Sequence, residues 1–519
     1  MLSGDPKMLA TVKSFALDGL NGYPVDIEVD TQKGVASFDI VGLPSNAVKE
    51  ARNRVRAAIK NSFFDFAPRR TTVNMAPADV KKDGSSFDFP MAIGFLAATE
   101  QLNISNHLDY VMIGELSLDG GVRKVNGVLP LLISALQNGY KKFIIPFENA
   151  VEASFIMGIE VYAVKTLAEA CAFIGGFANL KPIEFRTYVS KKNDNKYDVD
   201  LKYVKGQKIA KRALEIAVAG GHNILMSGPA GAGKTLLAKC VPTIMPDMTF
   251  EEAIETTKIH SIAGVLDGEQ GMVTTRPFRS PHHTASLMSL VGGGASSKCG
   301  EVSLAHNGVL FLDEMPEYNK KTLETLRQPI EDGVVNITRV ARSIEYPARF
   351  MLVASMNPCP CGNYGSRDPN KPCTCSISER RRYQNKISGP LLDRIDLYVQ
   401  VGGVEYDELR AKGEEESSQN VKARVEMARA IQRERFKNQG IKVNAEMNNR
   451  LINQYCELDD DSERLMKLAF RNQSLSARSF TRILKVARTI ADLAGREKIA
   501  VNDVAEAIQY KTKDLSDDN

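Results

Sequence analysis

Hydrophobic and polar positions change their spacing along the first third of the chain, and the changes predict strands that alternate with helices. Short β-rich runs, such as Pro24 to Asp30 and Phe38 to Val41, are followed by stretches such as Ala47 to Lys60, whose apolar positions recur every three or four residues. Residues from about 8 to 180 therefore predict an α/β domain. The polar stretch near residues 186–202 is typical of a linker.

Another β-rich apolar run, which ends at Ser227, leads into a glycine-rich turn and then into the apolar start of a helix. The turn has the complete spacing G-x-x-x-x-G-K-T, and strand, loop and helix follow in the order that a P-loop requires. Its glycines let backbone N–H groups turn toward phosphate oxygens, Lys234 supplies a positive charge, and the Thr235 hydroxyl can ligate Mg²⁺. The pattern predicts an ATP site formed by Gly228, Pro229, Ala230, Gly231, Ala232, Gly233, Lys234, Thr235 and Leu236.

The apolar run from Gly308 to Leu312 ends in the carboxylates of Asp313 and Glu314 and has the pattern of a buried parallel strand. Beside a P-loop, Asp313 is expected in the Mg²⁺ shell and Glu314 as the general base that polarises the attacking water. The two carboxylates therefore predict hydrolysis of ATP and not binding alone. Gln207 precedes the predicted helix from Lys208 to Gly220, and it either contacts the adenine base or caps that helix.

Length and composition indicate how many domains the chain contains and which class of protein it belongs to. The chain has 519 residues, enough for about three domains, and its 43% apolar and 25% charged residues are those of a soluble protein. A net charge of +4 does not by itself indicate a nucleic-acid surface. No apolar run is long enough to span a membrane and the N-terminus lacks a signal-peptide core, so we expect a cytoplasmic protein without membrane contact. Its cysteines are then expected to be thiols or metal ligands.

Four of the eight cysteines fall into two pairs, Cys359-Pro-Cys361 and Cys373-Thr-Cys375. Four thiols suit tetrahedral Zn²⁺, and the surrounding prolines and glycines permit the tight turns that such a site needs. A spacing of one residue between thiols is less diagnostic than the common spacing of two, so reduced structural cysteines are the alternative. A zinc ion held by four thiolates would be structural, because no coordination position is left open.

Two segments of the first domain, Lys82 to Ser86 and Gly114 to Arg123, resemble the proteolytic domain of Lon. In that comparison Ser86 takes the position of the nucleophile, whereas the position of the general-base lysine falls on Leu129. Leucine cannot take a proton from serine, so the Ser–Lys dyad is absent, and the alternative is that the neighbouring Lys124 substitutes for the base. The resemblance therefore predicts a Lon-like domain without peptidase activity, which serves as a scaffold or handles a substrate.

Between the two nucleotide-binding motifs, Arg276 to Ser286, Val291 to Gly294 and Gly300 to Asn307 resemble the magnesium-chelatase-like AAA+ ATPases. The Lon-like domain narrows this resemblance to the ComM/YifB subfamily, and nearly the whole chain is covered. Cys299 is a small departure, since a proline is expected there. The adjacent His282 and His283 have no carboxylate or cysteine at ligand spacing, so we interpret them as part of a structural or nucleic-acid-contacting loop and not as a metal site.

The resemblance implies three further catalytic residues. Asn357 matches sensor 1, which orients the hydrolytic water, Arg394 matches the arginine finger that reaches the γ-phosphate of a neighbouring subunit, and Arg478 falls in the sensor 2 motif. The alternative for Arg394 is an ion pair with Asp393 or Asp396. A site shared between subunits implies a homo-oligomeric ring, and the family implies a hexamer.

Two basic segments are candidate DNA contacts. A predicted β-hairpin at residues 331–347 carries Arg339 and Arg342, and in the resembled family this hairpin projects toward the pore of the ring. The helix predicted from Val421 to Lys442 carries seven Lys or Arg residues against two Glu. In both cases a solvated charged face is the alternative to contact with phosphates.

We therefore expect an α/β protein with a Lon-like domain at residues 1–182, a linker at 183–205, an AAA+ parallel-sheet core at 206–402 that contains the cysteine cluster, and a helical lid at 403–519. The resemblance implies a ring motor that hydrolyses ATP with Mg²⁺ and acts on branched or single-stranded DNA, in branch migration during homologous recombination or natural transformation. A magnesium-chelatase subunit and an ATP-dependent protease are the alternatives, and Leu129 opposes the second.

Overall fold

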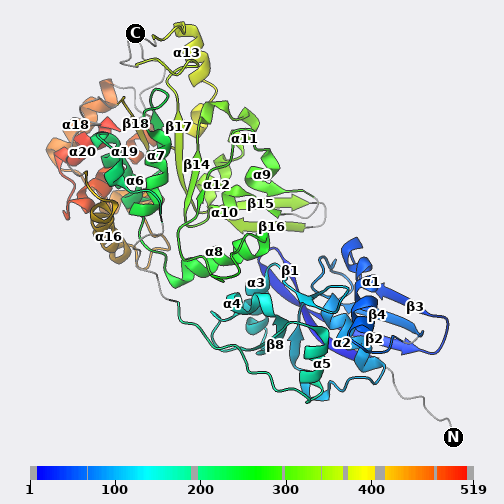
Figure 1. Cartoon of the computed structure of the whole chain (residues 1–519). Helices are drawn as coiled ribbons and strands as arrows, with labels where there is room; N and C mark the ends of the chain where they lie inside the picture. The colour runs from blue at the N-terminus through cyan, green and yellow to red at the C-terminus, as the bar shows by residue number, and fades with distance from the viewer. Residues whose placement is uncertain are drawn as a thin grey trace. The chain divides into compact units, whose positions relative to one another are not determined.

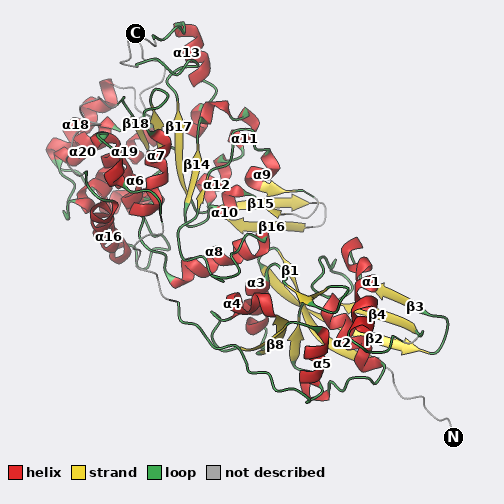
Figure 2. Cartoon of the chain, in the orientation of Figure 1, coloured by secondary structure: helices red, strands yellow, loops and turns green. Residues whose placement is uncertain are grey.

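A computed structural model describes residues 9–66, 68–188, 197–294, 298–339, 342–365, 372–403, 415–472 and 476–510 (Figure 1). The chain divides into two compact units, and helices alternate with strands in both of them (Figure 2). The first unit comprises Met1–Val189 and Phe250–Thr274, and the second comprises Ser190–Thr249 and Thr275–Asn519. Residues 250–274, which lie within the sequence range expected for the ATPase core, therefore pack with the first unit.

The first unit is built on a seven-stranded mixed sheet with the strand order β3-β4-β2-β1-β5-β8-β9. The pairs β1–β2 and β2–β4 are antiparallel, and the remaining neighbours are parallel. Parallel neighbours need crossover connections, which the intervening helices supply. The strands are β1 (Leu9–Asp18), β2 (Asn21–Gln32), β3 (Ser37–Val41), β4 (Arg70–Ala76), β5 (Tyr110–Met112), β8 (Lys142–Pro146) and β9 (Glu160–Val164), with a small separate hairpin of β6 (Glu115–Leu116) and β7 (Val122–Arg123).

Helices cover both faces of this sheet, because successive side chains of a strand point to opposite faces. On β1, Val12 joins a buried core with α1, α2 and α5, whereas Phe15 joins a second core with α3 and α4. Leu129 is fully buried in that second core, so the position of the missing general base is occupied by a packing residue. The helices are α1 (Asn46–Asn61), α2 (Asp88–Ala98), α3 (Val128–Gln137), α4 (Ala150–Ala153) and α5 (Leu167–Ile174).

Helix α8 (Phe250–Ala263) is fixed to the first unit by buried polar contacts. Ser261 donates a hydrogen bond from its hydroxyl to the Glu152 carboxylate over 2.8 Å, and its carbonyl accepts one from the Gly127 N–H over 3.1 Å. Glu152 is buried, so loss of this hydrogen bond would leave a carboxylate oxygen without its partner at a cost of about 1–3 kcal/mol. These contacts explain why a segment between two parts of the second unit packs with the first.

The second unit contains a five-stranded sheet with the order β11-β14-β17-β10-β18, in which every neighbouring pair is parallel. Its three middle strands are buried along their whole length, as expected of apolar strands covered on both faces. The predicted parallel-sheet core is thereby confirmed. The strands are β10 (Ile224–Ser227), β11 (Phe278–Arg279), β14 (Val309–Leu312), β17 (Met351–Met356) and β18 (Leu397–Gln400).

Helices and two small hairpins surround this sheet (Figure 1). The hairpins are β12 (Gly292–Gly293) with β13 (Lys298–Cys299), and β15 (Val334–Arg339) with β16 (Arg342–Pro347). The helices are α6 (Lys208–Gly220), α7 (Lys234–Ile244), α9 (Leu287–Val291), α10 (Glu301–Leu304), α11 (Lys320–Glu324), α12 (Arg327–Asp332), α13 (Ile377–Gln384) and α14 (Gly389–Leu392).

The C-terminal region is helical, as the sequence predicts. Its helices are α16 (Ser418–Arg435), α17 (Asn449–Tyr455), α18 (Asp460–Asn472), α19 (Ala477–Leu493) and α20 (Val501–Gln509). Val425 of α16 and Ile490 of α19 share one buried core with Leu214 of α6 and with the parallel sheet, so these helices form a single packed body with the strands. In the part of the chain that the structure describes, no helix combines the length and the apolar character needed to cross a membrane.

Candidate active site

The glycine-rich turn lies between β10 and α7, and glycine is required at three of its positions. Gly231 and Gly233 have φ values of +79° and +87°, in the left-handed region that other residues rarely adopt. Gly228 approaches the residue after β18 so closely that a Cβ atom would lie 2.1 Å from the Val401 carbonyl oxygen. The backbone of the turn therefore requires these three glycines, which belong to the P-loop sequence predicted to bind phosphate.

The ammonium group of Lys234 lies inside this turn. It donates hydrogen bonds to the carbonyl oxygens of Gly228 over 2.7 Å and Pro229 over 2.9 Å, and to Asn357 Oδ1 over 3.1 Å. Burial lowers the pKa of Lys234, and the nearby carboxylates of Asp313 and Glu314 oppose that shift. A positive charge is thus held between the P-loop and the residue that follows β17.

Thr235 and Asp313 present oxygen atoms side by side at the start of α7 and the end of β14. The Thr235 hydroxyl donates to Asp313 Oδ2 over 3.0 Å, and the Ser355 hydroxyl of β17 donates to Asp313 Oδ1. Hydroxyl and carboxylate oxygens are the ligands that Mg²⁺ prefers, and Mg²⁺ usually takes only one or two carboxylates from a protein. This pair of donors therefore fits the predicted magnesium position.

Glu314 begins the tight turn that follows β14. Its φ of +51° is uncommon for a residue with a side chain, and its backbone N–H donates to the Ser355 hydroxyl over 3.2 Å. The carboxylate is half exposed and lies 3.9 Å from Nδ1 of His283. His283 was not among the site residues that the sequence predicts, because it lies 31 positions before Glu314 and only the pairing of β11 with β14 brings the two together.

Gln207 makes its contacts with the backbone of its own chain. Its amide nitrogen donates to the Gly402 carbonyl over 2.6 Å and, more weakly, to the Ala232 carbonyl of the P-loop over 3.4 Å. Gln207 has a left-handed φ of +54° and immediately precedes α6 without a side-chain cap to that helix. The residue thus lies beside the P-loop, and the expected base contact is still a prediction.

Arg394 follows α14 and has partners that the sequence did not suggest. Its guanidinium forms an ion pair with Glu331 at the end of α12, and it donates to the Pro390 carbonyl over 2.7 Å. The two carboxylates weighed as partners contact other residues. Asp393 pairs with Arg478 over 3.5 Å and with Arg482 over 3.2 Å, whereas Asp396 Oδ2 lies 3.2 Å from Nδ1 of the buried His222. Arg478 thus pairs with Asp393, the residue that precedes Arg394 in the chain.

The candidate DNA-contacting residues differ in how far the structure describes them. Arg339 and Arg342 face each other in the last backbone pair of β15 and β16, while their side chains lie outside the described residues. On the basic helix α16, several side chains bind groups of their own chain: Lys422 pairs with Asp247, Arg424 with Glu215 and Glu416, Arg429 with the Val218 carbonyl, and Arg435 with Asp492. Much of the positive charge of α16 is thus paired within the chain.

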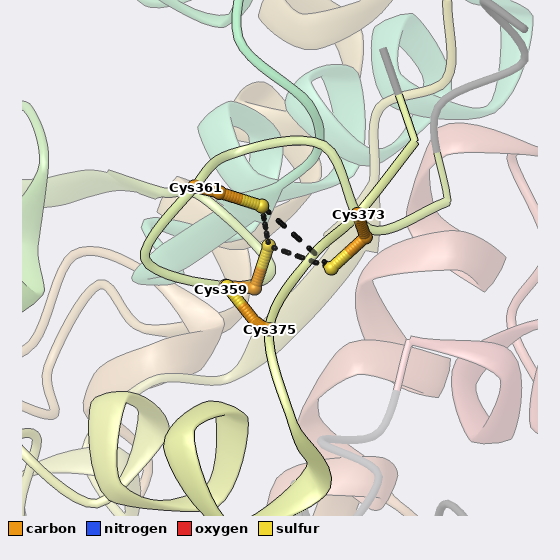
Figure 3. Close-up of side chains that lie close together, drawn as sticks. All are labelled: Cys359, Cys361, Cys373 and Cys375. Atoms are coloured by element: carbon orange, nitrogen blue, oxygen red, sulfur yellow. Dashed lines mark hydrogen bonds between the residues drawn. The ribbon is translucent and has the colours of Figure 1, made fainter.

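The four cysteines converge beyond the end of β17 (Figure 3). The Sγ atom of Cys359 lies 3.3 Å from that of Cys361 and 3.7 Å from that of Cys373. The Sγ atoms of Cys361 and Cys373 are 3.6 Å apart. All four sulfur atoms, including that of Cys375, lie within 4.8 Å of one another. Tetrahedral zinc with bonds of about 2.3 Å separates its sulfur ligands by about 3.8 Å. The cluster therefore has the donors and approximate spacing of a zinc site.

The pKa values of these thiols shift in different directions: burial raises the pKa of Cys373, whereas backbone groups lower that of Cys361. The backbone N–H of Asn363 lowers the pKa of Cys361, and the N–H of Tyr364 donates to Cys359 Sγ over 3.3 Å. Thiolates, and not thiols, are the ligands of a metal ion. Gly362, which follows Cys361, has a left-handed φ of +78°, and its carbonyl accepts a hydrogen bond from the Ala230 N–H of the P-loop over 3.3 Å.

Comparison with known families matches three consecutive parts of the chain. Residues 27–149 match a family described as subunit ChlI of Mg-chelatase, residues 200–409 match magnesium chelatase, subunit ChlI, and residues 415–511 match the C-terminal part of that subunit. The central match contains the P-loop, Asp313, Glu314, Asn357 and Arg394, and the last match contains Arg478.

Individual relatives extend over nearly the whole chain. The chain is 42% identical over 511 residues to the competence protein ComM of Haemophilus influenzae, which covers 97% of each chain. It is 41% identical over 510 residues to YifB of Escherichia coli, which covers 98% of this chain and 97% of YifB. Lon protease 2 of Bacillus subtilis is 33% identical over 147 residues, only 26% of this chain and 25% of that protease. The likeness to Lon is thus partial, whereas the other two relatives match in length and in sequence.

Proposed function

The chain belongs to the ComM/YifB family of magnesium-chelatase-like AAA+ ATPases, and we propose that it is an ATP-hydrolysing ring motor that acts on DNA. In this proposal the motor drives branch migration or strand separation during homologous recombination or natural transformation, and its ring is a hexamer. The observation that carries the hydrolytic part is that the P-loop is bonded to both following strands: Lys234 donates to Asn357 and Thr235 donates to Asp313, with Glu314 next in the chain to Asp313. The DNA part is supported by the relative named for competence and by the arginines at the tip of β15–β16.

Each side chain has a role that follows from its chemistry. Thr235 and Asp313 would hold Mg²⁺, which neutralises charge on the phosphate oxygens when it is bound. The Lys234 ammonium binds phosphate oxygens from within the P-loop turn, where two carbonyls already orient it. The Glu314 carboxylate accepts a proton from the attacking water, and the Asn357 amide orients that water.

Four more residues are assigned by proposal. Gln207, beside the P-loop, contacts the bound nucleotide, and Arg478 acts as sensor 2 from the helical region. Arg339 and Arg342, at the tip of β15–β16, contact DNA phosphates, and such contacts would make DNA binding weaken steeply with salt concentration.

We also propose that the four cysteines bind one structural zinc ion. The sulfur–sulfur distances of 3.3 to 3.7 Å and the turn at Gly362 support this site. With four thiolates around it, the ion would take no part in hydrolysis and would instead fix the loop that follows Asn357.

One experiment distinguishes this function from the chelatase and protease alternatives. The purified protein is given ATP alone or with a labelled four-way DNA junction, with casein, or with a porphyrin and Mg²⁺. We expect DNA to stimulate ATP turnover and the junction to be converted into its products only when ATP is hydrolysed. Insertion of Mg²⁺ into the porphyrin without any effect on DNA would instead support a chelatase subunit, which the family descriptions favour as the second candidate. Cleavage of casein would overturn the interpretation of Leu129.

A further inference from the structure

The turn between α14 and β18 carries Arg394, and we call residues 392–396 the finger turn. The residue before β10 holds one end of this turn. The Asn223 amide nitrogen donates to the Arg394 carbonyl over 3.0 Å, and the Asp396 N–H donates to the Asn223 carbonyl over 2.9 Å. Because β10 pairs with β18, which begins directly after the finger turn, the parallel sheet fixes this end of it.

Arg482 of α19 holds the finger turn from the helical region. Its Nη1 atom donates to the Ile395 carbonyl over 2.7 Å and to the Leu392 carbonyl over 3.3 Å, and its Nη2 atom donates to Asp393 Oδ1 over 3.2 Å. The Arg482 side chain is only 14% exposed, and a guanidinium keeps its charge and presents its donors in a planar fork. One cation thus binds residues on both sides of Arg394.

The finger turn depends on such contacts because it is short. The backbone N–H groups of Arg394 and Ile395 donate to carbonyls three positions earlier, over 3.0 Å each. The preceding α14 has only four residues, too few for a helix that is stable by itself. Ile395 is fully buried, where a carbonyl needs a hydrogen-bond donor, and Arg482 supplies one. Loss of the Arg482 guanidinium would therefore loosen the backbone that carries Arg394.

The Arg394 side chain is incompletely satisfied in its own chain. It contacts Glu331 and the Pro390 carbonyl, but its Nε atom is buried and has no hydrogen-bond partner among the residues that the structure describes. Buried donors are nearly always paired in folded proteins. The guanidinium would therefore gain by moving to new acceptors, whereas the backbone of Arg394 is held in place. How far the guanidinium can reach then depends on where the finger turn is held.

We infer that Arg482 is a positioning residue for Arg394, which holds the finger turn against α19 so that the guanidinium of Arg394 meets the phosphate bound by a neighbouring subunit. This inference rests on the proposed role of Arg394 across the subunit boundary. A displacement of about 1 Å in a group that stabilises the transition state costs up to about 10²-fold in rate. Loss of Arg482 should therefore impair the active site of the neighbour and leave the P-loop of its own chain intact.

The first part of the test measures the variants singly, in the full chain. For Arg482→Ala we expect kcat to fall about tenfold and the affinity for fluorescent ADP to stay within about twofold. Arg482→Lys keeps the charge without the planar fork, so it should recover part of the rate. The matched control is Lys485→Ala. Lys485 also lies on α19 and donates to the Ala445 carbonyl over 2.7 Å, away from the finger turn, so its loss should leave kcat within about twofold of the wild type.

The second part locates the defect by mixing chains. In an equal mixture of Arg482→Ala with Lys234→Ala, half of the intact P-loops face a correctly held Arg394, so turnover per Arg482→Ala chain should rise about fivefold if the sites act independently. In a mixture of Arg482→Ala with Arg394→Ala, no interface contains a correctly held arginine, and turnover should not rise. A loss of stability within the Arg482→Ala chain would not distinguish these two partners.

Three outcomes would overturn the inference. Wild-type kcat in Arg482→Ala would show that the finger turn needs no guanidinium from α19. A loss of ADP affinity, or no rise in turnover with Lys234→Ala chains, would place the defect in the site of the variant's own chain. If Arg394→Ala and Lys234→Ala also fail to restore hydrolysis in mixed rings, the proposed shared site fails and the inference with it. If that pair restores hydrolysis and Arg482→Ala does not, only the role of Arg482 is refuted.

Discussion

The P-loop lysine Lys234 donates a hydrogen bond to Asn357 Oδ1 over 3.1 Å, so two motifs that are 123 residues apart in the chain meet at one ammonium group. The contact follows from the parallel pairing of β10 with β17, in which Ser227 stands opposite Met356. Lys234, which follows β10, and Asn357, which follows β17, therefore lie at the same edge of the sheet. This edge is where ligands bind in open parallel sheets.

The first prediction separates binding of ATP from its hydrolysis. Lys234→Ala removes the charge that contacts the phosphates in the ground state, so nucleotide affinity should fall by about tenfold or more. Glu314→Gln keeps that charge and removes the base, so affinity should stay within about twofold while turnover falls by about 10² or more. Equilibrium titration with a fluorescent ATP analogue and steady-state turnover measure the two effects. Equal affinity of the wild type and Lys234→Ala would contradict the assigned role of the lysine.

The second prediction concerns the cysteine cluster. Protein purified without chelator should contain roughly one zinc per chain, and the double variant Cys359→Ser, Cys361→Ser should lose it. Because Cys359 follows Asn357 by two residues and Gly362 contacts the P-loop, we expect the metal-free protein to melt at a lower temperature and to turn over ATP more slowly.

A matched control for the zinc measurement is Cys299→Ser, since Cys299 is a partly buried cysteine outside the cluster. Its zinc content and melting temperature should equal those of the wild type. A wild-type preparation that is free of metal, fully folded and active would rule out a structural zinc ion, and the four thiols would then be reduced structural cysteines.

The sequence predicted those parts of the site that depend on local motifs. The P-loop and the pair Asp313–Glu314 are contiguous patterns whose surroundings fix strand, turn and helix, and the structure brings Thr235 to within 3.0 Å of Asp313. The cysteine cluster is similarly close in sequence, and its sulfur atoms converge. Local spacing is sufficient for such features because the chain between the residues is short and its turns are set by glycine and proline.

Contacts between distant segments were harder to predict. The sequence offered an ion pair with Asp393 or Asp396 as the alternative to an arginine finger, but within its own chain Arg394 pairs with Glu331, 63 positions away. Consecutive residues that follow the short helix α14 point in different directions, so proximity in sequence did not decide the pairing. The position of α8 in the first unit depends likewise on the buried Ser261–Glu152 contact, which no local pattern signals.

The charge of α16 shows a further limit of local patterns. Seven basic residues between Val421 and Lys442 suggested either a DNA surface or a solvated face. In the structure, Lys422 is only 18% exposed and pairs with Asp247, and Arg424 pairs with Glu215. Carboxylates from remote segments thus neutralise charges that look free in the sequence.

The last prediction is that Arg394 completes the active site of a neighbouring subunit. Within its own chain the guanidinium pairs with Glu331 and with the Pro390 carbonyl. An arginine that stabilises transition-state charge contributes about 10³ or more to the rate in related hydrolases, so Arg394→Ala should lose nearly all turnover while its P-loop still binds ATP. Turnover per chain of the wild type should also rise with protein concentration through the range in which the ring assembles.

Mixing two inactive variants provides the decisive measurement. Arg394→Ala keeps an intact P-loop, and Lys234→Ala keeps an intact arginine, so a mixed ring contains interfaces at which both are present. If the arginine acts across the interface, mixing should restore measurable hydrolysis that neither variant shows alone. Mixing Arg394→Ala with the double variant Lys234→Ala, Arg394→Ala is the matched control, because every interface then lacks the arginine.

The ion pair with Glu331 adds a condition to this mechanism. Arg394 must leave Glu331 to reach a phosphate in the adjacent subunit. Glu331→Gln removes the charge of the ion pair, so it should make this movement easier and should not abolish hydrolysis. If Arg394 instead acted within its own chain, no mixed ring of the two single variants would contain a complete site. Absence of any recovered activity, in mixed rings whose formation is shown by pull-down, would therefore refute the shared site and with it the structural reason for a ring.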